Sequence, residues 1–468
     1  MAPIPGHVAA LVALSCALAA FASGPPAASA STAPAERMSE STGGEAPADQ
    51  QPPPAQGPVQ PSGLQPQPLS TGEVSSGTLF NPAISVFLEG RYHRDGVHGE
   101  GGHILGEAMG FHGHHGSEDD HGHGHGGFTP GFSLAGTEME LSASVDRYFD
   151  AHVTLVFDGH SVEVEEAFGV TRSLPAGLTL MVGKFFSGIG YLNSQHPHQW
   201  DFADQALPYR LLLGSDGLND VGVQLTWLAP ARSYLLFGVE ALQGDNELVS
   251  NVIGHLDHEL ALGGLDEKAG PRLLTGFFKF GPDLGAAHAL QIGGFAGRSS
   301  LHQELHDHGE GRTYLEGTST FWGVDVVFKV DDPRPWGQGD LTLQGEYLRR
   351  VKDLGTVARE FDGPLSAARW TQDGAYVQTV YGFAPRFTAG LRWDAAGLTN
   401  RRVRAGTLEE WGSSSRVAAN VTFNPTEFSR LRLQAGRSRI LTEHGRETFN
   451  EFTVQLQLAL GVHGAHRF

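Results

Sequence analysis

Apolar and polar residues alternate one by one near the end of the chain, over residues 452–462. The apolar positions are Phe452, Val454, Leu456, Leu458, Leu460 and Val462, and the positions between them are Thr453, Gln455, Gln457, Ala459 and Gly461. Successive side chains of a β-strand point to opposite faces of the sheet. The pattern therefore predicts a strand with one face against lipid and the other toward a polar lumen.

The same rule, applied backwards along the chain, predicts about sixteen strands, with a range of 14 to 18. They fall near residues 80–93, 132–146, 148–157, 161–170, 177–186, 219–229, 232–243, 272–281, 287–298, 316–330, 338–350, 374–383, 386–395, 414–424, 427–437 and 449–462. We therefore expect an all-β fold, a transmembrane antiparallel β-barrel in a bacterial outer membrane. A soluble β-sandwich is the alternative, but it would need only about seven strands.

The predicted connections alternate in length, as they do in outer-membrane barrels. Short ones such as 229–231, 282–284 and 424–426 are expected to be periplasmic turns. Long ones such as 94–131, 187–218 and 244–271 are expected to be extracellular loops. An even number of strands would leave both chain ends in the periplasm. The terminal aromatic, Phe468, would serve recognition by the barrel assembly machinery.

The N-terminal part has the layout of an exported protein. An apolar stretch over residues 8–22 precedes the small residues Ala28 and Ala30, although no Lys or Arg comes before it, so residues 1–30 are predicted to be a signal peptide. Residues 31–78 are rich in Pro, Gln and Ser and are expected to form a disordered periplasmic linker before a barrel over 79–468. The single cysteine, Cys16, lies in the signal, which excludes disulfides; a lipoprotein role for Cys16 is the alternative.

Charge and motifs exclude several function classes. A formal net charge of −20 argues against nucleic acid as a partner. No catalytic motif of the Gly-x-Ser-x-Gly, His-Glu-x-x-His or phosphate-loop kind stands out in a suitable context, so we expect no enzyme, with an outer-membrane hydrolase as the alternative. The expected partners are outer-membrane lipid, the assembly machinery and a small solute or divalent metal. A homo-oligomer is left open.

Histidines concentrate in the predicted extracellular loops, beginning with a dense cluster in the first one. Together with neighbouring carboxylates they form the candidate metal ligands His112, His114, His115, Asp119, Asp120, His121, His123, His125, His196, His198, His255, His258, His306 and His308. Imidazole with interspersed carboxylate suits zinc above all, and also nickel or copper. No cofactor is required, and the loops could bind Zn²⁺. The alternative is a hydrated, low-complexity loop without specific ligands.

Charged residues are also expected on the lumen side of the wall. If apolar residues mark the lipid face, the candidate pore-lining residues are Glu138, Glu140, Glu163, Arg386, Arg392, Arg416, Arg430 and Arg432. Acidic early strands would then face basic late ones, an arrangement that favours polar or charged solutes. Alternatively, these charges pair with each other and plug the lumen. The long loop 187–218 is apolar enough to fold inward, or it covers the barrel mouth.

Three stretches of the sequence resemble a known family. They are residues 184–193 (KFFSGIGYLN), residues 195–200 (QHPHQW) and the ending 464–468 (GAHRF). Together they are similar to porin-like outer-membrane proteins often labelled zinc-regulated TonB-dependent outer-membrane receptors, over roughly residues 80–468. The resemblance implies an outer-membrane barrel with a role in zinc uptake.

Two functions follow as hypotheses. The first is a porin-like channel for small solutes, including zinc or its complexes, enriched locally by the His-rich loops. The second is a non-conducting outer-membrane receptor, or a receptor of the TonB-dependent type, that binds its ligand through the outer loops. TonB-dependent transporters have a barrel of about 22 strands around a folded plug, whereas only a linker precedes about sixteen predicted strands here. The sequence therefore favours the channel.

Overall fold

The computed structural model describes residues 82–461, except 112–127, 129, 135, 158–160, 254–264, 266–267, 308–310 and 360–363. The chain divides into two units, Met1–Pro61 and Ser62–Phe468, and every described residue belongs to the second. The predicted signal peptide, the linker and Phe468 lie outside the described residues.

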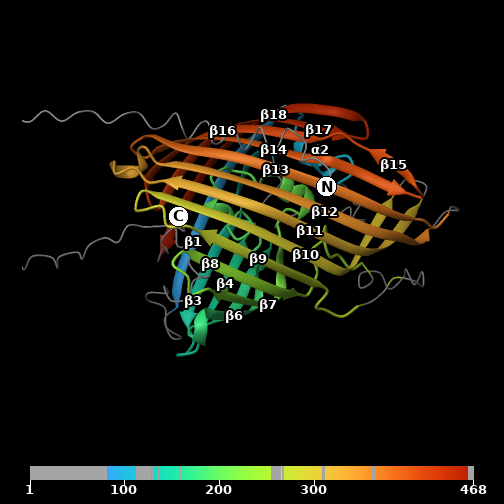
Figure 1. The fold of residues 1–468 in the computed structure, drawn as a ribbon. Coiled ribbons are helices and arrows are strands. Elements are labelled where there is room, and N and C mark those ends of the chain that lie inside the picture. The colour runs from blue at the N-terminus through green and yellow to red at the C-terminus, as the bar shows by residue number, and fades with distance from the viewer. Residues whose placement is uncertain are drawn as a thin grey trace, which may run out of the picture. The chain divides into compact units, whose positions relative to one another are not determined.

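Sixteen long strands of the described residues close into one antiparallel barrel (Figure 1). Each strand pairs with its neighbour in sequence, and β1 pairs with β18 to complete the ring. Their bounds are β1 Ala83–Asp95, β3 Thr137–Ser144, β4 Phe149–Phe157, β5 Val162–Thr171, β6 Leu178–Phe186, β7 Asn219–Leu228, β8 Tyr234–Leu242, β9 Leu273–Gly281, β10 His288–Asp307, β11 Arg312–Val330, β12 Leu341–Arg359, β13 Ala367–Ala384, β14 Phe387–Arg404, β16 Ser414–Thr426, β17 Ser429–Thr442 and β18 Gly445–Gly461. Two short strands, β2 (Gly131–Leu134) and β15 (Thr407–Glu410), add to β1 and β14. All sixteen predicted strands are confirmed.

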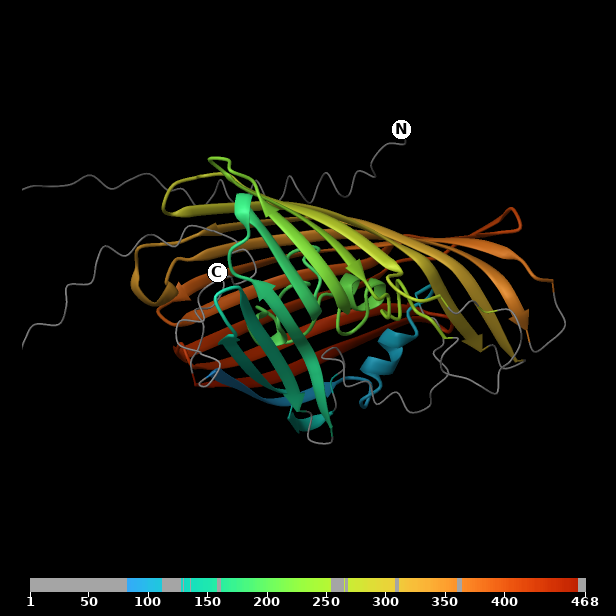
Figure 2. The same ribbon diagram turned by 90° about the horizontal axis from the view of Figure 1, so that it is seen from below.

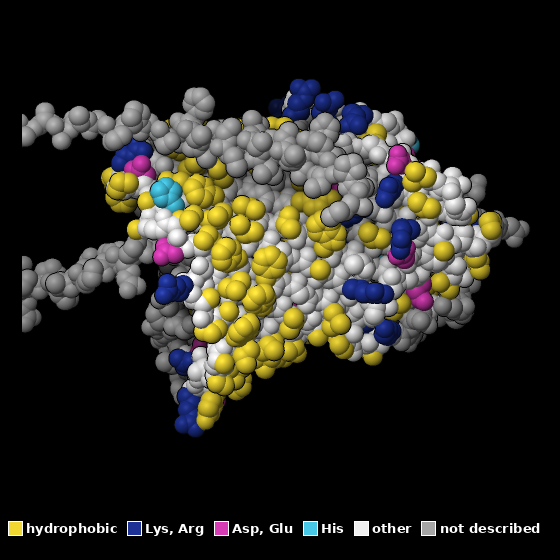
Figure 3. Space-filling view, viewed as in Figure 1, with side chains coloured by type: hydrophobic (Ala, Val, Ile, Leu, Met, Phe, Trp, Pro, Cys, Tyr) yellow, Lys and Arg dark blue, Asp and Glu magenta, His cyan; other side chains and the backbone are white. Residues whose placement is uncertain are grey.

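Side-chain alternation gives the barrel an apolar outer face and a polar inner face. On β18, Leu456 is 45% exposed and Leu460 is 54% exposed, whereas Gln455, on the opposite face of the strand, is only 2% exposed. Apolar side chains cover much of the outer surface in Figure 3, while charged side chains gather toward its ends. A closed antiparallel barrel with an apolar outer belt is the architecture of bacterial outer-membrane proteins. The outer membrane is therefore its location, as predicted.

Strands β10 to β14 extend well past the lengths that the alternation predicts. Each has 18 to 20 residues, whereas a tilted strand crosses the bilayer with about 9–11. The prediction for β10 stopped at residue 298 because apolar alternation stops there, but the pairing of β10 with β11 continues past an irregularity to Asp307. His302 and His306, expected in a loop, therefore lie in a strand.

Helices are few and short among the described residues. The six-residue helix α2 (Gly101–Gly106) follows β1, and the six-residue helix α3 (Leu207–Leu212) lies in the connection between β6 and β7. Three single 3₁₀ turns complete the set: η1 (Pro175–Gly177), η2 (Pro197–Gln199) and η3 (Pro335–Gly337). None of the helices in the described part of the chain has the length and apolar character needed to cross a bilayer.

The outer belt predicts a depth-dependent cost of charge on β18. Leu456→Arg should destabilise the barrel by about 2–4 kcal/mol, because Leu456 lies about halfway along the roughly 9–11 residues that cross the bilayer from the periplasmic end of β18. Leu460→Arg, on the same face but next to the periplasmic end of the strand, should cost about 0–1 kcal/mol. Urea unfolding of protein folded into lipid vesicles measures both. Equal costs at the two positions would contradict the assigned membrane depth.

Candidate functional site: the loop-filled lumen

The connection between β6 and β7, residues 187–218, folds into the barrel instead of covering its mouth. Figure 2 shows its green segment, including α3, enclosed by the strands. Ten of its apolar side chains belong to a buried cluster that they share with the barrel wall, among them Ile189, Leu207 and Tyr209, each fully buried. We call residues 187–218 the inner loop. Of the two sequence-based alternatives for this loop, the inward one is correct.

Glu240 on β8 holds the beginning of the inner loop. Its carboxylate accepts hydrogen bonds from the Ser187 hydroxyl, at 2.5 Å, and from the Gly188 backbone N–H, at 2.8 Å. The Thr275 hydroxyl on β9 donates to the same carboxylate. Glu240 is only 3% exposed, so these donors replace the water that a buried carboxylate loses.

Glu346 on β12 holds the next turn of the loop in the same way. The backbone N–H groups of Tyr191 and Leu192 donate to it at 3.1 and 2.9 Å. The hydroxyls of Tyr209 and Tyr376 also donate hydrogen bonds to this carboxylate, at 2.8 and 2.5 Å. Three of these donors belong to the loop, so Glu346 fixes the loop to β12.

On the basic side of the lumen, Asp204 of the inner loop lies between two arginines. Arg392 on β14 and Arg416 on β16 approach its carboxylate to 2.9 and 2.7 Å, and both also contact Asp394, at 3.0 Å. Burial alone would raise the pKa of Asp204, but the two guanidinium groups outweigh it and lower that pKa to about 2. Asp204 therefore remains ionised at any physiological pH.

Arg430 and Arg432 on β17 bind the backbone of the same loop. Arg430 donates to the carbonyl of His198 at 3.0 Å, and Arg432 donates to the carbonyl of Trp200 at 2.7 Å. The carbonyl of Trp200 also accepts a hydrogen bond from Arg430 at 3.4 Å. The arginines predicted to line a pore thus point inward, but they serve mainly to anchor the inner loop.

The remaining predicted pore residues have different environments. Glu138 points into the lumen and is buried, and Glu140 lies two residues along the same face of β3. Glu163 stays exposed and pairs with Lys184 at 3.5 Å, away from the packed lumen. Arg386 differs from the expectation, because it lies in the turn between β13 and β14 and places its guanidinium over the Trp336 ring at 4.2 Å.

A cluster of carboxylates and imidazoles fills the lumen where the inner loop meets β3 and β5. We define the Glu–His cluster as Glu138 and Glu140 on β3, Glu165 and Glu166 on β5, and His196 and His198 on the loop. Nδ1 of His198 lies 2.7 Å from Glu138. Nδ1 of His196 lies 3.0 Å from Glu165 and 3.5 Å from Glu138, and its Nε2 lies 2.9 Å from Glu166.

Local backbone geometry explains how these side chains converge. Glu138 and Glu140 share a face because they are two residues apart in a strand. The pairing of β4 with β5 shifts between Thr154 and Leu155, so the consecutive residues Glu165 and Glu166 are both buried on the inner side. On the loop, Pro197 begins the single turn η2, which leaves the rings of His196 and His198 stacked 5.6 Å apart.

His196 is surrounded by negative charge. Burial lowers the pKa of an imidazole, but the carboxylates of Glu165 and Glu166 outweigh burial and raise the pKa of His196 well above its ordinary value. Both ring nitrogens lie within hydrogen-bond distance of a carboxylate. The same nitrogen and oxygen atoms are zinc ligands in other proteins.

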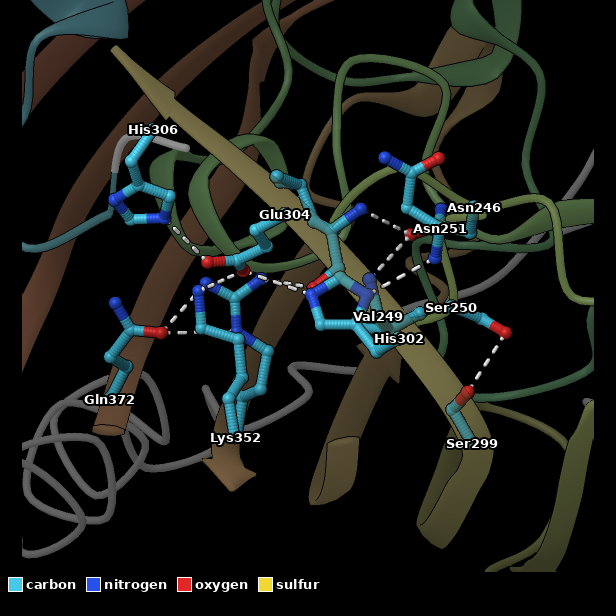
Figure 4. Close-up of polar contacts among 12 residues, drawn as sticks. Asn246, Val249, Ser250, Asn251, Ser299, His302, Glu304, His306, Lys352 and Gln372 are labelled. Carbon is cyan, nitrogen blue, oxygen red and sulfur yellow. Dashed lines mark hydrogen bonds and ion pairs between the residues drawn. The ribbon is translucent and has the colours of Figure 1, made fainter. Parts of the chain in front are cut away.

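A second group of histidines lies at the outer end of β10 (Figure 4). His302 donates from Nε2 to Glu304 at 2.9 Å, and its Nδ1 accepts the backbone N–H of Asn251 at 3.1 Å. His306 also contacts Glu304 at 2.9 Å, and the Lys352 ammonium forms an ion pair with that carboxylate. We call this group the Glu304 cluster. It fastens the segment around residue 251 to β10, and its carboxylate is already neutralised by a lysine.

The remaining predicted metal ligands lie outside the described residues. They are His112, His114, His115, Asp119, Asp120, His121, His123, His125, His255, His258 and His308. Sequence reasoning did not find Glu165, Glu166, Glu240, Glu346 or Asp204. Glu240 and Glu346 could have been found from the sequence, because each is a charged residue on the polar face of a predicted strand. Glu165 and Glu166 could not, because the shifted pairing of β4 with β5 leaves no recognisable pattern in the sequence.

Comparison with known proteins gives one clear sequence relative. The chain is 37% identical over 363 residues to an uncharacterised protein of Aquifex aeolicus, covering 76% of this chain and 74% of that protein. No family model matches the sequence.

Solved structures with a similar course of the chain are outer-membrane channels and porins by name. The channel DcaP of Acinetobacter baumannii is 12% identical, covering 81% of this chain and 97% of its own, with a TM-score of 0.47. The anion-selective porin of Comamonas acidovorans is 8% identical, covering 81% and 99%, with a TM-score of 0.47. The porin-like barrel assigned here follows from the strand register itself, which closes sixteen antiparallel strands of the described residues.

The arginine pair around Asp204 allows a direct test of how firmly the inner loop is held. Asp204→Ala should lower the free energy of unfolding by about 3 kcal/mol, because it leaves two buried guanidinium groups short of one partner. The control is Asp353→Ala, which removes an exposed ion pair with Arg369 and should change stability little. Urea unfolding of the refolded barrel measures both variants, and equal effects would contradict a buried anchor.

Proposed function

We propose that this chain, which belongs to the same family as that Aquifex aeolicus protein, is a narrow outer-membrane channel for small polar solutes. The observation that carries the proposal is the inner loop, which crosses the lumen and is held by polar side chains. A loop held in this way narrows the passage and lines it with charge. Such a lining favours small hydrated or charged solutes over apolar ones.

The anchors come from strands all around the barrel. Besides Glu240 and Glu346, Gln378 on β13 donates to Asp201 at 3.1 Å, and Asn420 on β16 donates to the carbonyl of Asp201 at 2.9 Å. Gln434 on β17 accepts the backbone N–H of Ala203 at 2.8 Å. Because the loop is tied to facing walls, we expect a passage that is narrower than the barrel and changes little in width over time.

We further propose that divalent metal, with zinc first, is among the solutes. Two observations support this: the imidazoles and carboxylates at the lumen, and the density of His and Asp between residues 112 and 125. Histidines outside a pore raise the local concentration of a weakly bound cation near the entrance, and weak binding at several sites still allows the ion to leave. No catalytic step is needed for this function.

Single-channel conductance of the refolded protein tests the channel. We expect small, discrete steps for the native chain, because the inner loop narrows the passage. Glu346→Ala removes the acceptor for two backbone N–H groups and should give larger or noisier steps. The control is Glu409→Ala, which removes a carboxylate paired with Arg402 on the β14–β15 hairpin. Silence of the native chain in planar bilayers would overturn the channel.

The zinc part has its own test in cells. Deleting residues 112–125 should lower zinc accumulation when zinc is scarce, because the local supply of metal at the entrance is lost. The barrel should still fold, since the deleted residues lie between β1 and β2, outside the strands. Whole-cell metal content by mass spectrometry measures the effect. Accumulation equal to that of the full-length protein would contradict the metal role.

A non-conducting receptor is the second candidate, and the number of anchors favours it. If the inner loop seals the lumen, the extracellular side would bind a ligand without passing it on. The two functions separate in the conductance experiment. A receptor gives no steps with the native chain and gains steps only after Glu346→Ala, whereas the channel conducts in both forms.

A further inference from the structure

We propose that the Glu–His cluster is a binding site for one divalent metal ion, with zinc preferred, held between the inner loop and the β3–β5 wall. The inference deepens the proposed function, on which its meaning for transport rests, by naming where a permeating ion would stop. The binding itself can be measured without any transport. Two overlapping sets of donors define the site, and they share Glu138.

The first set has near-coordinating geometry. One ligand atom each from Glu138, Glu165 and His196 lies within 4.8 Å of the others. In a tetrahedral zinc site with bonds of about 2.0–2.1 Å, neighbouring ligand atoms are about 3.3 Å apart. Here Nδ1 of His196 is 3.0 Å from Glu165 and 3.5 Å from Glu138. Both distances from His196 are thus within a few tenths of an ångström of the tetrahedral value.

The second set adds donors on the other side of Glu138. Ligand atoms of Glu138, Glu140 and His198 also lie within 4.8 Å of one another. The His198 ring stacks on Phe87 with centroids 3.8 Å apart, and the backbone carbonyl of His198 accepts a hydrogen bond from Arg430. The ring position is therefore fixed before any ion arrives. Because the two sets share Glu138, His198 and Glu140 are the candidates for a fourth ligand of the first set.

The outer shell of His196 is an independent sign of a metal site. While Nδ1 faces Glu138 and Glu165, the opposite nitrogen, Nε2, lies 2.9 Å from Glu166. A metal-bound histidine typically donates its other N–H to a carboxylate, which orients the ring and makes it a better ligand. Glu166 in turn accepts the backbone N–H of Phe186 at 3.1 Å, so this supporting carboxylate is itself held.

The charge of the cluster favours a divalent cation. Four carboxylates meet two imidazoles in a part of the lumen where His196, His198 and Glu138 are each no more than 8% exposed. Buried carboxylates need compensating positive charge. A divalent ion between the two donor sets would supply that charge. The mixed nitrogen and oxygen donors select zinc over magnesium or calcium, which prefer oxygen alone.

The Glu304 cluster shows what a closed arrangement of the same residue types is like (Figure 4). There the Lys352 ammonium already forms an ion pair with the Glu304 carboxylate. Both ring nitrogens of His302 already have hydrogen-bond partners. An ion entering that cluster would have to displace a lysine and break a backbone contact. In the Glu–His cluster the imidazoles of His196 and His198 contact the carboxylates, and imidazole is itself a zinc ligand.

Metal titration of a folded barrel lacking residues 112–125 tests the site, because this deletion removes the dense histidine tract that would mask it. We expect one Zn²⁺ per barrel by calorimetry, and Co²⁺ should give the visible absorption of a tetrahedral nitrogen–oxygen site. Glu138→Gln, which belongs to both donor sets and keeps the side-chain size, should weaken Zn²⁺ binding at least tenfold. The control is His288→Gln at the periplasmic end of β10.

Glu165→Gln is the second variant, for use if Glu138→Gln fails to give the heat-dependent gel shift of a folded barrel. Unchanged Zn²⁺ affinity in a folded Glu138→Gln or Glu165→Gln protein would overturn the site, as would absence of binding to the deleted barrel. Conductance of the same preparations is read separately. Loss of binding in a barrel that still conducts supports the site, and binding to a silent barrel keeps the site while ending the channel.

Discussion

The absence of water in the bilayer core is the constraint on which the rest of this structure depends. Every backbone N–H and C=O group at membrane depth must be paired within the protein, and a closed ring of strands achieves this without a free edge. Pairing of β1 with β18 closes that ring. Once it is closed, alternate side chains must face lipid or lumen. The lipid face has to be apolar, and the lumen face is left free to carry charge.

The lumen uses that freedom mainly to bind a loop. Glu240, Glu346 and four arginines are costly to bury, and each contacts a specific partner on the inner loop; the arginines are Arg392, Arg416, Arg430 and Arg432. Apolar residues of the loop pack between these contacts and exclude water, which strengthens them. Wall and loop are therefore interdependent: the loop satisfies charges that the strands present, and the strands fix a loop that has almost no regular structure of its own.

The extent to which the sequence predicts this arrangement follows from the same physics. All sixteen strands could be predicted, because lipid imposes an alternation that any reader of the sequence can recognise. The outer extensions of β10 to β14 could not, since beyond the membrane only hydrogen-bonded pairing continues and the side chains follow no simple pattern. Arg386 was misplaced for a related reason: near a turn the alternation rule no longer determines the direction of a side chain.

The Glu–His cluster shows the limit of such reasoning at the site. Glu138, Glu140, His196 and His198 could each be singled out from sequence, but as members of two different features, a pore wall and an outer loop. They meet only because the inner loop folds back onto β3. Glu165 and Glu166 escape notice because a shifted strand pairing lets consecutive residues share a side, which regular alternation forbids.

The two sides of the lumen differ in chemistry as well as in charge. Around Asp204 the partners are guanidinium groups, which keep their protons at any physiological pH and form a permanent contact. Around Glu138 the partners are imidazoles, which together with carboxylates are ligands of divalent metal ions. The inner loop is thus fixed permanently on its basic side. On its acidic side it rests on the nitrogen and oxygen atoms of the Glu–His cluster, and this is the side where we propose that a metal ion is recognised.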